Sequence, residues 1–201
     1  MNQASYDSSC ALIVVDVQND FARPEGALYV SGGEDIVPVI NEEIREALEA
    51  GALVVYTQDW HPPETPHFQA QGGLWPAHCV QGTWGSELAP DMHVAGEVVR
   101  KGSGAEDGYS GFTVEDRMSG EKRPTKLEGM LRARGIDRVV IVGLATDYCV
   151  QETVFDARSL GFETVLRADA VRAVNLEPGD GKRALEAMRA AGARLEDLPS
   201  A

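Results

Sequence analysis

Ionisable or nucleophilic side chains come shortly after several apolar runs of the sequence. These residues are Asp16, Asp59, His61, Lys101 and Cys149. Near-continuous apolar runs are typical of parallel strands buried on both faces, and ligands of such sheets bind beyond the carboxyl ends of the strands. Neighbouring strands would therefore bring carboxylates, an ammonium group, an imidazole and a thiol into one cleft.

The residues Asp16, Lys101 and Cys149 could together carry out nucleophilic catalysis. Cys149 begins a helical pattern, where backbone N–H groups and the helix dipole favour a thiolate. A free cysteine is more often a small buried apolar side chain, which is also what we expect of Cys10 and Cys79. Asp16 closes an apolar strand and would act either as a general base or as a turn carboxylate. Lys101 would lower the pKa of the thiol and hold the carboxylate, or lie in solvent at a strand end.

Three of the four histidines, His61, His67 and His78, follow one another closely and accompany Asp59. If the strand stays extended through Asp59, the period of two puts Asp59 and His61 on one side. One carboxylate oxygen and three imidazole nitrogens suit zinc, iron(II) or manganese, with positions left open for water or substrate. Histidines of a surface loop are the alternative interpretation.

The elements that must position these residues alternate along the chain. Apolar runs predict strands at 11–15, 52–56, 97–99, 139–142 and 164–166. Apolar residues three or four apart predict helices between them: Val37, Ile40, Ile44 and Leu48 in the first, then 127–131, 150–160 and 185–191. Alternating strands and helices predict an α/β fold, a three-layer α/β/α arrangement with a mainly parallel central sheet. Residues 60–87 and 102–124 fit neither period, and loops of this length are usually functional or disordered.

Composition limits the kinds of partner. The chain has 201 residues, which fits one domain over residues 1–201, and 43% apolar with 25% charged residues is ordinary for a globular protein. A net charge of -14 repels phosphate backbones and anionic lipids, so we expect neither nucleic acid nor a membrane as a partner. Three scattered cysteines without a CxxC pair, and the lack of a leader or spanning segment, favour a cytoplasmic protein.

Six stretches of the sequence, in order between residues 11 and 171, match the pattern of a known family. They are Ile13-Val14-Val15-Asp16-Val17-Gln18-Asn19-Asp20-Phe21, Asp59-Trp60-His61-Pro62, Trp75-Pro76-Ala77-His78-Cys79-Val80, Lys101-Gly102, Tyr109-Ser110-Gly111-Phe112 and Gly143-Leu144-Ala145-Thr146-Asp147-Tyr148-Cys149-Val150. In this combination the chain resembles the nicotinamidases, also called pyrazinamidases, of the isochorismatase-like cysteine hydrolase superfamily. It departs from the family pattern at Tyr148, which is histidine in some members, and in a polar stretch at 114–124.

The resemblance implies the isochorismatase-like hydrolase fold and a role for each matching residue. Asp16 would be base and acid, Lys101 its charged partner and Cys149 the nucleophile. The backbone N–H groups of Ala145 and Cys149 would form the oxyanion hole, beside a cis peptide bond that precedes Ala145. The metal ligands would be Asp59, His61, His67 and His78, and the substrate pocket would be lined by Phe21, Trp75, Tyr109, Leu144 and Tyr148.

The implied reaction is hydrolysis of nicotinamide to nicotinate and ammonia through a thioester, in NAD salvage, with pyrazinamide as a further substrate. The cofactor would be one divalent metal ion, zinc first and iron or manganese next, without an organic cofactor. A monomer or a small homo-oligomer is expected. Two alternatives stay open: hydrolysis of another small compound, such as an N-carbamoyl amide or an isochorismate-like vinyl ether, and a metal-binding or interaction protein without turnover.

Overall fold

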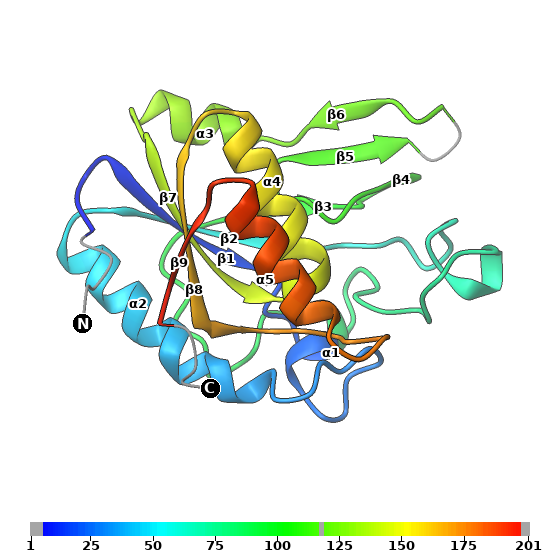
Figure 1. The fold of residues 1–201 in the computed structure, drawn as a ribbon. Helices are drawn as coiled ribbons and strands as arrows, with labels where there is room; N and C mark the ends of the chain where they lie inside the picture. The colour runs from blue at the N-terminus through cyan, green and yellow to red at the C-terminus, as the bar shows by residue number, and fades with distance from the viewer. Residues whose placement is uncertain (1–5, 117–118, 198–201) are drawn as a thin grey trace.

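Six parallel strands form the central sheet, in the order β3-β2-β1-β7-β8-β9 (Figure 1). The structure is a computed structural model and describes residues 6–116 and 119–197. The strands are β1 (Cys10–Val15), β2 (Leu53–Asp59), β3 (Glu97–Lys101), β7 (Arg138–Leu144), β8 (Glu163–Arg172) and β9 (Arg194–Glu196). All five predicted strands are confirmed. The sixth, β9, was not predicted, because its three residues include a single apolar side chain.

Helices cover both faces of this sheet and enclose two apolar cores. Along β1, alternate side chains enter the two cores: Leu12 and Val14 face one, and Ile13 and Val15 face the other. The first face is covered by α2 (Val37–Glu49), and the second by α3 (Leu127–Ala133), α4 (Gln151–Ser159) and α5 (Asp180–Ala190) (Figure 1). This confirms the predicted three-layer α/β/α fold.

One detail of the helix prediction is wrong. Leu48 was expected to face the core, but it is 40% exposed, and Ala47 is buried in its place. The other predicted positions of α2 are buried. Successive residues of a helix turn by about 100°, so the buried stripe runs through residue 47 and leaves Leu48 at its margin.

The strand order reverses direction between β1 and β7, and this reversal defines the edge of the sheet where ligands bind in α/β folds. Asp16 follows β1, and Cys149 comes shortly after β7. Gly143 pairs with Val15 and has a φ of 116°. A side chain at residue 143 would overlap the Val15 carbonyl group, so glycine permits the close approach of the two strands just before the site.

The two irregular segments differ from each other. Residues 102–124 contain a small antiparallel sheet of β4 (Glu106–Asp107), β5 (Thr113–Asp116) and β6 (Lys122–Pro124) (Figure 1). These strands have two to four mostly polar residues each, too few to produce an apolar run. Residues 60–87 contain only short turns of 3-10 helix, and a further short helix, α1 (Asn19–Ala22), follows β1. No helix among residues 6–116 and 119–197 is long and apolar enough to cross a membrane.

Candidate active site and metal centre

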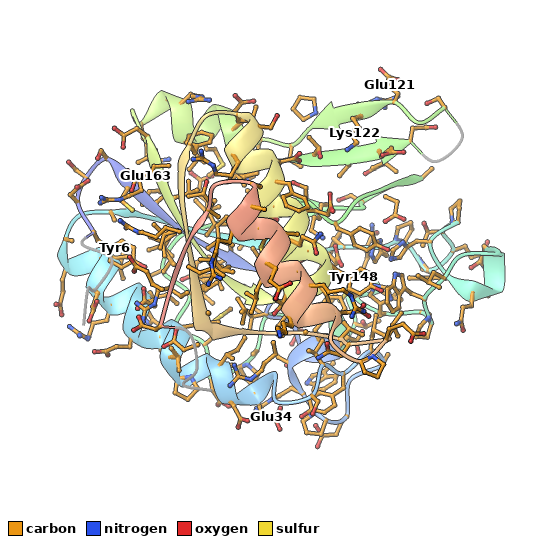
Figure 2. All side chains as sticks on the ribbon, viewed as in Figure 1. Tyr6, Glu34, Glu121, Lys122, Tyr148 and Glu163 are labelled. Atoms are coloured by element: carbon orange, nitrogen blue, oxygen red, sulfur yellow. The ribbon has the colours of Figure 1, made fainter. Side chains whose placement is uncertain are left out.

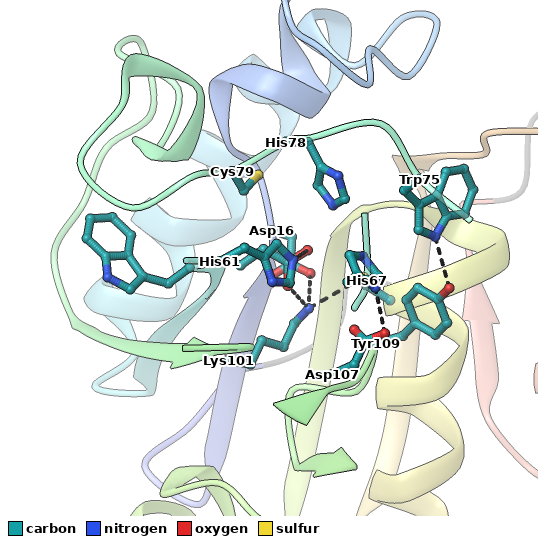
Figure 3. Close-up of polar contacts among 12 residues, drawn as sticks. Asp16, His61, His67, Trp75, His78, Cys79, Lys101, Asp107 and Tyr109 are labelled. Atoms are coloured by element: carbon teal, nitrogen blue, oxygen red, sulfur yellow. Dashed lines mark hydrogen bonds and ion pairs between the residues drawn. The ribbon is translucent and has the colours of Figure 1, made fainter. Parts of the chain in front are cut away.

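A buried lysine joins two carboxylates at the carboxyl ends of the central strands. Lys101 lies directly opposite Asp59 in the pairing of β3 with β2, so both side chains project from the same face of the sheet. The Lys101 ammonium group contacts Asp59 Oδ1 and lies 2.9 Å from Asp16 Oδ2 (Figure 3). All three side chains are buried, and each carboxylate therefore has the charged partner that burial requires.

Cys149 reaches the same place from the neighbouring strand β7. The peptide bond between Leu144 and Ala145 is cis, as the resemblance implied, and a π-helical turn at Thr146–Val150 then carries the cysteine. The Cys149 sulfur lies 3.6 Å from Lys101 Nζ. The sulfur and the ligating oxygens of Asp16 and Asp59 all lie within 4.8 Å of one another. The structure thus brings the predicted base, cation and nucleophile together.

Burial determines the resting protonation of this group. It raises the pKa of the Cys149 thiol well above its usual value, and the charge of Lys101 offsets only part of this effect. The direction expected for Lys101 is therefore confirmed, but the net shift is upward because burial has the larger effect. Burial also raises the pKa of Asp16, although Lys101 and a hydrogen bond from Thr57 oppose the shift. Cys149 thus rests as a thiol beside a carboxylate of raised proton affinity.

Two residues that sequence reasoning missed hold the carboxylates in place. Thr57 donates a hydrogen bond to Asp16 Oδ1 over 2.6 Å. The amide group of Gln18 accepts from the Asp59 N–H over 2.8 Å and donates to the Asp59 carbonyl oxygen over 2.7 Å. The period of two in β2 was a usable signal for Thr57, because it shares a face with Asp59. Gln18 lies within a stretch that carried the resemblance, but it received no role there.

The three clustered histidines meet in space as well as in sequence. The ligating nitrogens of His61, His67 and His78 lie within 4.8 Å of one another. His67 Nδ1 lies 2.5 Å from a carboxylate oxygen of Asp107 (Figure 3). His78 Nδ1 lies 2.8 Å from the Pro76 carbonyl oxygen. Both contacts leave Nε2 available as a ligand. Burial lowers the pKa of His78 to about 4, so its imidazole is neutral at pH 7, the form that binds metals.

His61 gives the strongest reason to expect a cation. Both of its ring nitrogens are buried and have no hydrogen-bond partner among the described residues. A buried imidazole with two unsatisfied nitrogens is costly, and a metal ion would satisfy one of them. The neighbouring Gly102, with a φ of 64°, leaves room for the ring, since a Cβ there would lie 2.6 Å from His61 Cε1. The donor set therefore fits a divalent cation.

Asp59 lies between the two groups of residues. Its Oδ1 contacts Lys101, and its Oδ2 lies 3.8 Å from His61 Nε2. One of its carboxylate oxygens lies within 4.8 Å of both a carboxylate oxygen of Asp16 and the Cys149 sulfur. The set of three histidine nitrogens that lie equally close to one another does not include Asp59. Burial opposes its ionisation, but Lys101 and His61 hold its pKa well below the usual range. Asp59 is thus a charged carboxylate that connects the histidines to the lysine.

An aromatic pocket of about 380 Å³ opens onto both groups. Each residue assigned to substrate binding by the resemblance lines it, together with Ala145, Cys149, His67 and His78. Trp75 Nε1 donates a hydrogen bond of 3.0 Å to the Tyr109 hydroxyl group (Figure 3), and the Tyr148 ring stands edge-on to Trp75 at 5.0 Å. In the view of Figure 2, Tyr148 lies to the right of the centre, whereas Tyr6 and Glu163 lie on the left. A pocket of this volume and lining suits a small flat ring.

Comparison with known proteins gives the family. The family model for the isochorismatase domain matches residues 10–200. The chain belongs to the isochorismatase family. Within this family, a nicotinamidase from Escherichia coli K12 is 38% identical over 206 residues and covers 94% of each chain.

Two solved structures of the isochorismatase fold also resemble the chain closely. A pyrazinamidase from Pyrococcus horikoshii in complex with zinc has a TM-score of 0.84 and 43% identity, over 94% of this chain and 99% of that one. A protein from L. infantum in complex with nicotinate has a TM-score of 0.85 and 36% identity, over 96% of this chain and 94% of that one. The resemblance read from the sequence is thereby confirmed.

Proposed function

We propose that this member of the isochorismatase family is a nicotinamidase that hydrolyses nicotinamide to nicotinate and ammonia. The observation that carries the proposal is the shared pocket: Cys149, His67 and His78 line one aromatic pocket. Relatives named nicotinamidase and pyrazinamidase, at 38% and 43% identity, support the same substrate class. Pyrazinamide, which has the same ring size and carboxamide group, is proposed as a further substrate.

The cation of this enzyme would be held by Asp59, His61, His67 and His78. When bound, it supplies a Lewis-acid contact for the ring nitrogen of the substrate, and so orients the carboxamide. Zinc is our first choice, since nitrogen and oxygen donors suit it and the Pyrococcus relative was solved with zinc. Phe21, Trp75, Tyr109, Leu144 and Tyr148 enclose the ring and exclude water.

Acylation uses the buried lysine, carboxylate and thiol. Asp16 accepts the proton of the Cys149 thiol as the sulfur attacks the carboxamide carbon. The charge of Lys101, 3.6 Å from the sulfur, stabilises the thiolate as it forms. Backbone N–H groups of Ala145 and Cys149 would hold the oxyanion. Asp16 then returns its proton to the leaving nitrogen, the C–N bond breaks, and ammonia departs from a nicotinoyl thioester.

In deacylation, Asp16 accepts a proton from water and donates a proton to the Cys149 sulfur. Asp16, again a carboxylate, takes a proton from a water molecule that attacks the thioester carbon. The C–S bond breaks, and the proton on Asp16 returns to the Cys149 sulfur. The product leaves as nicotinic acid, which loses its proton to solvent and becomes nicotinate. The raised pKa of Asp16 suits both directions, because a carboxyl group that changes role must bind a proton readily.

We also propose a single catalytic unit over residues 1–201 in the cytoplasm. The site residues run from Asp16 to Cys149 and meet at one edge of one sheet. All three cysteines are buried and free, which suits a reducing compartment.

Ammonia release from nicotinamide by metal-analysed protein tests the proposal. Cys149→Ala should abolish release, and Cys10→Ala, at the other end of β1, should leave it unchanged. Mass spectrometry of rapidly quenched wild type should find a nicotinoyl group on Cys149. Release from an N-carbamoyl amide, with none from nicotinamide, would overturn the substrate assignment. A metal-loaded protein inert towards both would favour a binding function without turnover.

A further inference from the structure

Asp107, which the sequence did not single out, makes a direct contact with the histidine cluster. It lies in β4, the first strand of the small antiparallel sheet, where it pairs with Glu115 of β5. Its side chain is 18% exposed, and its Oδ2 lies 2.5 Å from His67 Nδ1 (Figure 3). Its other oxygen accepts a hydrogen bond of 2.7 Å from the Gly108 N–H. Both carboxylate oxygens are thus engaged, and the side chain is fixed.

We propose that Asp107 is a positioning residue of the metal centre, which holds His67 through Nδ1–H so that Nε2 faces the cation. The inference rests on the metal centre of the proposed function. A carboxylate on the outer nitrogen of a ligand histidine fixes the tautomer and the ring orientation and makes the inner nitrogen more basic. Asp107 does not itself touch the substrate pocket's nucleophile or base.

The three histidines differ in how they are held, and this difference singles out Asp107. The outer nitrogen of His78 meets a backbone carbonyl oxygen, which no substitution removes. Neither nitrogen of His61 has a hydrogen-bond partner within the described residues, so packing orients this ring. His67 depends on a side chain from a separate small sheet. The orientation of His67 is therefore held by a side-chain hydrogen bond that one substitution at Asp107 removes.

The residue that follows this short strand contacts the catalytic lysine. Lys101 Nζ donates a hydrogen bond of 3.3 Å to the carbonyl oxygen of Gly108, the residue after Asp107. Two successive residues thus contact the histidine cluster through a side chain and the lysine through the backbone. The small sheet, whose β5 and β6 overlap the polar stretch at 114–124, supports the centre from outside the main sheet.

Competition for zinc between the zinc-loaded protein and a chromophoric chelator tests this role directly. Asp107→Ala should weaken zinc binding by about 10–100-fold, the usual loss when such an outer partner is removed. Asp107→Asn should lose less, because an amide oxygen can still accept from His67 Nδ1–H. Glu106→Gln is the matched control on the same strand, because the Glu106 carboxylate accepts a hydrogen bond from the Gly104 N–H and not from a histidine, and it should bind zinc as wild type does.

A second readout separates positioning from folding. Thermal unfolding of the metal-free proteins should give the same midpoint for Asp107→Asn and wild type, and saturating zinc should restore most of the ammonia release of Asp107→Ala. Equal zinc affinity for wild type and Asp107→Ala would overturn the inference, as would an equal loss in Glu106→Gln. Zinc affinity is measured without turnover. A zinc-binding wild type that releases no ammonia from nicotinamide would therefore contradict the proposed function alone.

Discussion

Two clusters of charged residues, each built around a buried cation, share the same physical design but differ in their surroundings. The catalytic cluster consists of Lys101 with Asp16 and Asp59. The distal cluster consists of Arg167 with Glu43, Asp169 and Asp197: Arg167 Nη1 contacts Glu43, and Nη2 lies 3.0 Å from Asp197 Oδ2. Each places one cation among carboxylates and has a hydroxyl group bonded to one of them, Thr57 to Asp16 and Tyr6 to Glu43.

The difference lies in what each cation can reach. Lys101 has a thiol 3.6 Å away, and its partner Asp59 lines the aromatic pocket. The distal cluster has no member in that pocket, and it connects α2, β8 and the chain end near residue 197. Burying a cation costs desolvation free energy in both clusters, and pairing with carboxylates offsets part of that cost in both. This energetic comparison alone does not distinguish the catalytic cluster from the distal cluster. A buried ion cluster therefore indicates catalysis only when a nucleophile and a cavity adjoin it.

The largest effect should come from removing the cation of the catalytic cluster. Lys101→Met takes away the charge that stabilises the forming thiolate and orders Asp16, so kcat/KM for nicotinamide should fall by about 10³-fold or more. Steady-state ammonia release measures this. A variant that keeps kcat/KM within about tenfold of wild type would remove Lys101 from the mechanism and would make the two clusters equivalent.

The matched change in the distal cluster should act on stability. Arg167→Met leaves Glu43 buried without its cation, so the free energy of unfolding should drop by about 3 kcal/mol. The kcat/KM of the folded protein should stay within about twofold of wild type. Urea unfolding and ammonia release on the same preparation check both statements. A parallel loss of kcat/KM would contradict the division between the two clusters.

A smaller effect is expected where the catalytic cluster meets the histidines. Gly102→Ala adds a Cβ 2.6 Å from His61 Cε1, so the ring must move and zinc affinity should fall by about tenfold. Gly51→Ala is the control, because Gly51 has a similar φ of 75° with no atom within 4 Å of the added Cβ. Chelator competition on both variants separates displacement of the ring from backbone strain. Equal affinities in the two would mean that His61 does not bind the cation.

The smallest effect concerns the pH profile. Thr57 stabilises ionised Asp16, so Thr57→Val should raise the pKa of Asp16 further. Asp16 must be ionised to accept the thiol proton, and activity is lost as the pH falls through its pKa. The acid limb of kcat/KM should therefore move to higher pH, by about one unit or less. Thr164→Val, in the distant β8, should leave the limb in place. A downward shift in Thr57→Val would contradict the assigned role of Asp16.

The site residues at strand ends could be predicted from the sequence better than the site residues in loops. Asp16, Asp59 and Lys101 each lie at the end of a buried strand, so the apolar runs predicted that these side chains share one cleft. The ion pair between Lys101 and Asp59 was not predicted. The three histidines are brought together by a segment that has no regular apolar period. Only their closeness in the sequence and the resemblance to the family predicted that they form one site. Asp107 could not be predicted, because a two-residue strand of polar residues leaves no pattern. The net upward shift of the Cys149 pKa could not be predicted, because burial, which outweighs Lys101, is a property of the whole fold.

The pairing of β1 with β7 also determines how early during synthesis the active site can form. Residue 10 pairs with residue 138, so β1 leaves the ribosome roughly ten seconds before its partner at ordinary rates of synthesis. During that interval Asp16 exists, but the turn that carries Cys149 does not. The nascent chain therefore cannot hydrolyse the amide until most of it has been synthesised. During refolding, the recovery of ammonia release would report the pairing of β1 with β7.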